Sequence, residues 1–124
     1  MHMGDGDVFV DIGCNDGTLF RFVDKNITRV GFDPNDYKAE SSKHADIIIN
    51  NYFNAKEYQK TKHGHKKAKV ITSIAMFYDL EDPSSFVRDV KKTLDKNGLW
   101  IIQMSYLPLM LKQLAFDNIC HEHL

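Results

Sequence analysis

Two glycines and two carboxylates lie within or directly after the first apolar run of the chain, at a spacing that could serve a ligand. Asp11 lies within that run, and Gly13, Asp16 and Gly17 lie in the turn behind it. Glycine permits a sharp turn and lets a ligand approach the backbone without meeting a Cβ atom. Carboxylates in the same turn disfavour a pyrophosphate and favour a ligand that carries positive charge. Together with Asn15, these residues are expected to bind a cationic ligand.

A further carboxylate, Asp33, ends the second predicted strand, about 20 residues beyond the glycine turn. A carboxylate at that place can accept hydrogen bonds from both ribose hydroxyls of an adenosine. The dinucleotide fingerprint G-x-G-x-x-G fails, because Asn15 and Thr18 occupy the positions of its later glycines. The pattern therefore favours S-adenosylmethionine, which carries an ammonium, a sulfonium and an adenosine, over NAD.

Residues at the ends of the predicted strands extend this candidate cofactor site. Pro34 follows Asp33, and Asn51 and Tyr52 follow the third strand, where the adenine would lie. Ser73 lies near the end of the fourth strand. All four are candidates for cofactor binding, although polar residues and an Asp-Pro pair are also ordinary ways to end a strand.

Short apolar runs alternate with segments of helical periodicity along the chain. Strands are predicted at 8–12, 28–32, 46–50, 69–74 and 99–104. Helices are predicted at 17–25, 36–44, 54–60, 83–95 and 108–115. This α/β alternation predicts a Rossmann-like, doubly wound parallel sheet of about five strands, with ligands at the carboxyl ends of the strands.

Length and composition narrow the class of protein. The 124 residues fit one domain, 1–124. A formal net charge of -1 gives no general attraction to nucleic acid or to an anionic membrane, and no apolar run approaches the roughly 20 residues of a membrane span. The two cysteines, Cys14 and Cys120, form no C-x-x-C pair, which excludes a four-cysteine zinc site. We expect a cytoplasmic protein with reduced thiols and no metal.

The segments D-I-G-C-N-D-G and G-F-D-P resemble the cofactor motifs of class I S-adenosylmethionine-dependent methyltransferases. The tail F-D-N-I-C-H-E-H, residues 116–123, is similar to the F-D-x-I-x-H-E-H segment of the nucleotide-sugar C-methyltransferase family. The resemblance implies the central domain of an enzyme that methylates a carbon next to a keto group on a nucleotide-linked deoxysugar. It also implies that the chain is truncated and lacks the last two strands of a complete class I sheet.

The same resemblance implies catalytic roles for His121, Glu122 and His123. His123 matches the family's base and Glu122 its neighbouring carboxylate, and histidine can remove a proton next to a carbonyl near neutral pH. Cys120 stands where the family commonly has tyrosine, and Tyr78 where it often has histidine. A non-catalytic S-adenosylmethionine-binding or interaction module, derived from a methyltransferase, therefore stays open as the alternative.

The expected partner is a small-molecule substrate, possibly a nucleotide sugar, with no nucleic acid and no membrane. The last predicted strand, 99–104, is apolar and would lie at a sheet edge. Such an edge can pair with another chain, so we expect a homodimer with two-fold symmetry. The alternative is that the tail 106–124 covers the edge within one molecule.

Overall fold

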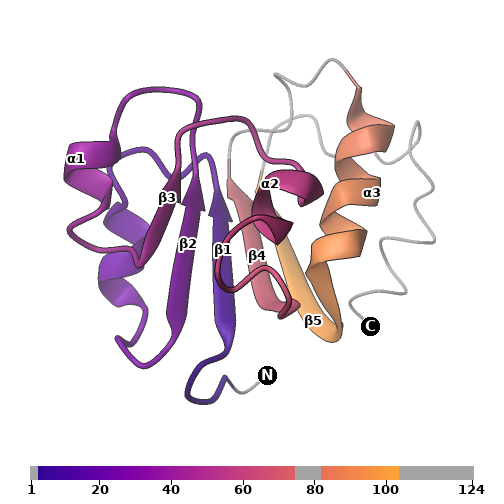
Figure 1. Ribbon diagram of the computed structural model, residues 1–124, viewed down its shortest axis with the longest axis horizontal. Coiled ribbons are helices and arrows are strands. Elements are labelled where there is room, and N and C mark those ends of the chain that lie inside the picture. Colours follow the sequence, from indigo (N-terminus) through magenta and orange to yellow (C-terminus); the bar gives the residue numbers. More distant parts are fainter. Residues whose placement is uncertain (1–2, 75–81, 104–124) are drawn as a thin grey trace.

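The computed structural model describes residues 3–74 and 82–103. Five parallel strands form one sheet in the order β3-β2-β1-β4-β5 (Figure 1). The strands are β1 (Val8–Ile12), β2 (Thr28–Phe32), β3 (Ile47–Ile49), β4 (Ala68–Ile74) and β5 (Leu94–Gln103). The predicted Rossmann-like parallel sheet is confirmed, and β1 and β2 have the predicted bounds.

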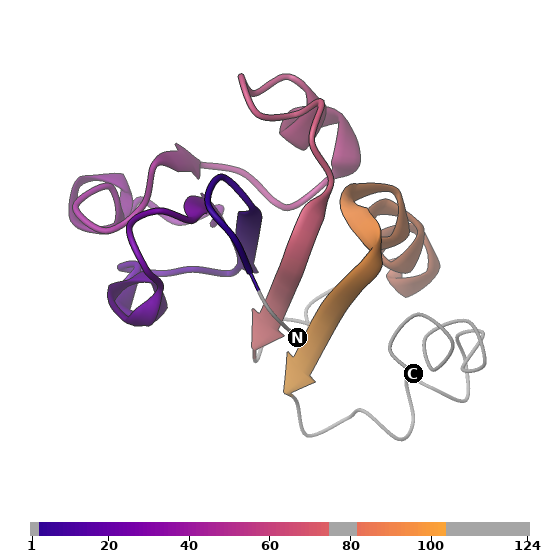
Figure 2. The ribbon, with the colours of Figure 1, turned by 90° about the horizontal axis from the view of Figure 1, so that it is seen from below.

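Four helical segments connect the strands and cover both faces of the sheet. They are η1 (Thr18–Phe22), α1 (Lys38–Ser41), α2 (Ala55–Gln59) and α3 (Pro83–Thr93). Figure 2 shows η1 and α1 on one side of the sheet and α2 and α3 on the other. The chain builds outward from β1 to β3, then crosses to β4, so the direction of winding reverses between β1 and β4. In open α/β sheets a ligand binds at such a reversal, outside the carboxyl ends of the strands.

A separate apolar cluster fills each face of the sheet. Alternate residues of β1 point to opposite faces, as a strand requires, and all five residues are buried. On the α2–α3 side, the ring of Phe53 lies 5.0 Å from that of Phe32 and 5.7 Å from that of Phe86. On the η1–α1 side, Phe9 packs edge-to-face on Phe20 at 6.0 Å. Burial on both sides explains why β1 reads as a continuous apolar run.

The first predicted helix, 17–25, is wrong in type and length, because a five-residue 3₁₀ helix occupies its place. Val23 is extended, and its N–H donates to the carbonyl of Phe20, which closes the segment with a tight turn. Threonine, phenylalanine and valine are weak helix formers, and Phe20 is buried, so packing overrides the helical spacing. The second helix is also shorter than predicted, whereas Asn54 caps α2 as expected by accepting from the N–H of Glu57 at 2.9 Å.

The predicted boundary between the last described helix and strand is wrong as well. The prediction placed the helix end at 95 and the strand start at 99, but α3 ends at Thr93 and β5 begins at Leu94. Leu94 pairs with Ala68 and Leu99 pairs with Val70, so an irregular segment between them carries the predicted Asn97-Gly98 stop. The predicted helix 108–115 lies outside the described residues. Within residues 3–74 and 82–103, no helix has the length and apolar character needed to cross a membrane.

Candidate functional site

The glycine turn follows β1 at the carboxyl edge of the sheet, beside the point where the winding reverses. Gly13, Asn15 and Gly17 have positive φ angles of 77°, 51° and 80°. The N–H groups of Gly13 and Cys14 both donate to the carbonyl of Phe32, at 2.7 and 3.0 Å. The backbone of the turn is therefore left-handed at these three residues, and the turn is held to the end of β2.

Asp11 is a buried acid at the base of this turn. The hydroxyl of Thr72 donates to its Oδ1 at 2.7 Å, and within the described part of the chain no other group donates to this carboxylate. Burial raises the pKa of Asp11 to about 6; the Thr72 hydrogen bond opposes this shift and the charge of Asp33 adds to it. At neutral pH the carboxylate is mostly ionised. Among the described residues no group donates a hydrogen bond to its second oxygen, which suits a cationic ligand group.

Asp33 joins the two loops that follow β1 and β2. Its side chain is buried; Oδ2 accepts from the N–H of Asn15 at 2.9 Å, and Oδ1 accepts from that of Asn35 at 2.8 Å. An ionised carboxylate has about four acceptor sites, so these two bonds leave room for ribose hydroxyls. Asp33 thus has a structural role in the site that its position in the sequence did not reveal.

The end of β3 is tied to the same edge by Asn50. Its amide nitrogen donates to the carbonyls of Asp33 at 3.0 Å and Asn35 at 2.8 Å. The side chain of Asn51 accepts from the N–H of Tyr52 at 2.8 Å, and Tyr52 is 60% exposed. The structure therefore brings Asn51 and Tyr52 to the loop edge shared with Asp33, with an aromatic ring accessible to a ligand.

Ser73 and Gly17 have packing roles that the sequence did not indicate. Ser73 is fully buried, and its hydroxyl accepts from the indole N–H of Trp100 at 2.8 Å, so a cofactor contact for it stays a prediction. A Cβ at Gly17 would lie 3.0 Å from the Cα of Ser41. Gly17 is therefore required where the turn packs against α1, as well as for its positive φ.

Asp16, Cys14 and Pro34 complete the turn and its surroundings. Asp16 is exposed and accepts hydrogen bonds from the N–H and hydroxyl of Thr18, which lower the pKa of Asp16, with a lesser electrostatic contribution from His44. Cys14 is buried; burial and then the charges of Asp11 and Asp33 raise the pKa of its thiol to about 12. The raised pKa disfavours the thiolate, which is the nucleophilic form of cysteine. Pro34 is half-buried beside Asp33.

The sequence did not indicate a role for Thr72, which among the described residues is the only hydrogen-bond donor to the Asp11 side chain. The available signal was a polar residue inside the apolar run of β4, on the face that alternation assigns to Asp11. The predicted catalytic residues His121, Glu122 and His123 lie outside the described residues, as do Tyr78 and Cys120. Among the described residues, no three His, Cys, Asp or Glu side chains are grouped so that they could hold a metal ion.

The sheet carries a left-handed glycine turn, a buried acid and a second acid after β2. This arrangement is typical of α/β domains that bind a nucleoside-containing cofactor. The family model described as a methyltransferase domain matches residues 4–124. The chain therefore belongs to the methyltransferase domain family.

Similar proteins agree with this assignment. The C-methyltransferase NovU of Streptomyces niveus is 29% identical over 123 residues, covering 96% of this chain and 29% of that protein. The chain thus spans less than a third of the length of this curated relative.

Solved structures support the fold. The plantazolicin methyltransferase BpumL, in complex with a desmethylPZN analog and SAH, has a TM-score of 0.64 at 16% identity and covers 94% of this chain and 47% of that one. A SAM-dependent methyltransferase from Geobacter sulfurreducens, in complex with S-adenosyl-L-homocysteine, has a TM-score of 0.54 at 18% identity, covering 81% and 42%. The chain spans about half the length of each.

Proposed function

We propose that the chain binds S-adenosylmethionine at the carboxyl edge of β1, β2 and β3. The observation that carries this proposal is the buried carboxylate of Asp11, which has a single described donor and lies beneath a left-handed glycine turn. The turn residues, 11–17, would surround the ammonium and sulfonium. Asp33 and Pro34 would hold the ribose, Asn51 and Tyr52 would flank the adenine, and Ser73 would lie at the end of β4.

The described residues fit this cofactor by charge. Asp11 and Asp33 place two carboxylates around the turn, and their mutual repulsion contributes to the raised pKa of Asp11. A bound cation relieves that repulsion, so cofactor binding and the ionised state of Asp11 should favour each other. When bound, S-adenosylmethionine would supply an electrophilic methyl group.

We propose that the acceptor is a carbon next to the keto group of a nucleotide-linked deoxysugar. The match of residues 116–123 to the H-E-H segment and the 29% identity to a C-methyltransferase support this acceptor class. His123 would take the proton from that carbon, leaving its electron pair as the enolate, with Glu122 and His121 beside it. We also propose that the protein is located in the cytoplasm.

Two titrations and one assay test these proposals. Calorimetry should show saturable binding of S-adenosylhomocysteine and no comparable binding of NAD; the reverse would contradict the cofactor assignment. Incubation with S-adenosylmethionine and a keto-deoxysugar nucleotide should yield a product heavier by one methylene. Cofactor binding without any such product would instead support the non-catalytic binding module.

We propose, in addition, that the chain self-associates through β5. β5 is one of the two edge strands of the described sheet, the other being β3, and Ile101 on β5 is 43% exposed. Backbone groups along the uncharged segment of this edge strand, residues 98–102, can pair with a second copy.

A further inference from the structure

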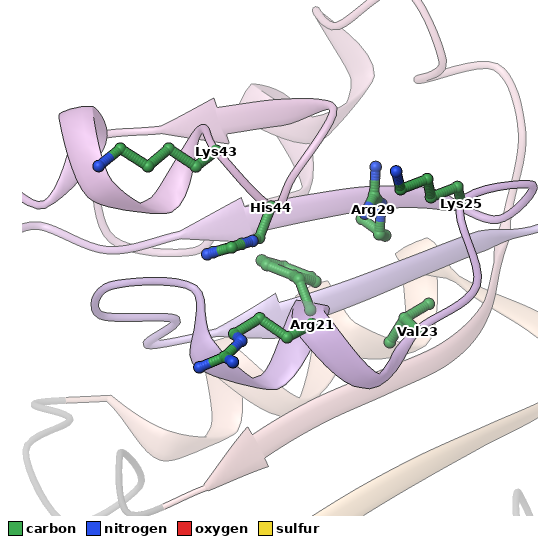
Figure 3. A pocket seen from close by; sticks show the side chains of 7 residues that line it. Arg21, Val23, Lys25, Arg29, Lys43 and His44 are labelled. Carbon is green, nitrogen blue, oxygen red and sulfur yellow. The ribbon is translucent and has the colours of Figure 1, made fainter.

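A basic pocket lies on the η1–α1 face of the sheet, apart from the predicted cofactor residues. It has a volume of about 350 Å³, within the range of small-ligand sites. Its lining consists of Phe20, Arg21, Val23, Lys25, Arg29, Lys43 and His44. Figure 3 shows Arg21, Lys43 and His44 toward one end and Lys25 and Arg29 at the other. Five of the seven lining residues are basic and none is acidic, which is an unusual excess in a chain of net charge -1.

Three of these cations have no ion pair within the described part of the chain. Arg21, Lys25 and Lys43 form no salt bridge with any described carboxylate. They come from η1, the loop before β2 and the loop after α1, so three separate segments bring positive charge to one hollow. Like charges held together repel, and an anion between them removes that repulsion.

The acids near the pocket are already engaged or lie outside its lining. Asp46 pairs with Arg29, its Oδ2 lying 3.3 Å from Nε, and also accepts from the backbone N–H of Arg29 at 2.8 Å. Asp16 accepts two bonds from Thr18 in the glycine turn. Asp24 lies between Val23 and Lys25 in the sequence; it is exposed and is not part of the pocket lining. The pocket therefore keeps a net positive charge.

We propose that the basic pocket binds a phosphate-bearing small molecule, separately from the cofactor site. Phosphate oxygens accept charge-assisted hydrogen bonds from guanidinium and ammonium groups. Cations at both ends suit a ligand with more than one anionic group, such as a diphosphate, and Val23 and the buried Phe20 give the hollow apolar walls. The concave shape and the low net charge of the chain favour a small molecule over an extended nucleic acid.

The test uses calorimetric titration of the full chain with inorganic pyrophosphate, after saturation with S-adenosylhomocysteine. The pocket variant Lys25→Gln/Lys43→Gln should bind pyrophosphate at least tenfold more weakly than the wild type. The control variant Lys62→Gln/Lys96→Gln loses the same charge from exposed lysines elsewhere and should bind like the wild type. Circular dichroism verifies that both variants are folded.

A parallel titration with uridine diphosphate identifies the source of the phosphate. Equal affinity for both probes means that the pocket recognises the diphosphate alone, and tighter binding of the nucleotide means that its organic part also contacts the walls. Absence of saturable binding, or equal weakening in both variants, would overturn the proposal. Loss of pyrophosphate binding on saturation with S-adenosylhomocysteine would also overturn it, because the anion would then share the cofactor site. The S-adenosylhomocysteine titration itself reports independently on the proposed function.

Discussion

Asp11 combines two properties that work against each other: its ionised form destabilises the empty fold and attracts a cationic ligand. Its pKa rises from 3.8 to about 6 on folding. A raised pKa contributes stability that is fully present below the unfolded value and is lost as the pH rises through the folded value. Between about pH 4 and pH 6 this group should therefore lower the free energy of unfolding by about 3 kcal/mol.

The variant Asp11→Asn should separate these properties. Its side-chain oxygen can still accept from Thr72, but the buried charge is gone, so the free energy of unfolding at pH 7.5 should rise by about 1–3 kcal/mol. The gain should shrink at pH 5, where the wild-type carboxyl is largely protonated. Affinity for S-adenosylmethionine should fall at least tenfold. Urea unfolding at the two pH values and calorimetry check this; lower stability at pH 7.5 would contradict the assigned cost of the charge.

Asp33 offers a second test at residue scale, because it serves both the loops and the proposed ribose site. Asp33→Ala removes the acceptors for the N–H groups of Asn15 and Asn35, so we expect a lower melting temperature and at least tenfold weaker S-adenosylhomocysteine binding. Asp36→Ala removes an exposed acid from the same loop and serves as the control. An unchanged dissociation constant in folded Asp33→Ala would exclude the ribose assignment.

His123 should matter for turnover and not for cofactor affinity. His123→Asn should bind S-adenosylhomocysteine within about twofold of the wild type, while methyl transfer to a keto-deoxysugar nucleotide falls by a factor on the order of a hundred. The reason is that a general base acts on the acceptor carbon alone. His65→Asn, an exposed histidine in the loop after α2, is the matched control. Equal rates in the His123 variant and the wild type would remove this residue from the mechanism.

At the scale of elements, close contact between strand and turn restricts β2 to a glycine at its fourth residue, Gly31. A Cβ on Gly31 would lie 2.7 Å from Sγ of Cys14, 2.9 Å from Cδ1 of Ile48 and 3.1 Å from Cε2 of Phe20. The glycine therefore lets the turn after β1 and the helix η1 pack directly on the strand. Glycine inside a strand often marks such an approach.

Gly31→Ala should overpack this contact and lower the free energy of unfolding by about 1–3 kcal/mol. Urea denaturation measures the change, and Gly4→Ala is the control, because its Cβ would have no neighbour closer than 3.9 Å. Adding Cys14→Ala should recover part of the loss by removing the nearest atom. Wild-type stability in Gly31→Ala would show that β2 and the turn are less closely packed than the structure indicates.

An element could be predicted to the residue only where the neighbouring sequence marks its two ends. β1 and β2 were predicted to the residue, because an apolar run and an Asp-Pro stop mark their ends. The start of β5 was not, because its first pair joins Leu94 to Ala68 and is followed by an irregular segment that local sequence does not encode. Long-range pairing also hid the partner of Asp11, since Thr72 lies on another strand.

At the scale of the whole molecule, the two proposed binding sites lie at different parts of the sheet. The cofactor site uses loops at the carboxyl edge, where β1, β2 and β3 end together, and the basic pocket uses the flank of β2 under η1 and α1. Both depend on the packing of α1 against the glycine turn at Gly17 and Ser41. A ligand in the basic pocket would therefore touch the same segments that position the turn.

The edge of the sheet gives the last prediction, which concerns assembly. β5 lies at one edge of the described sheet, opposite β3, and residues 98–102 carry no charge that would discourage pairing with a second chain. We expect sedimentation across a concentration series to show a dimer, since closed two-fold assemblies are the commonest.

Ile101→Lys places a charge on β5 at a residue that is 43% exposed, and it should shift the equilibrium toward monomer. Phe22→Lys adds the same charge at an 80% exposed side chain on η1 and should leave the dimer unchanged. A wild-type monomer of 14.3 kDa at high micromolar concentration would contradict pairing through β5 and would favour coverage of the edge within one molecule.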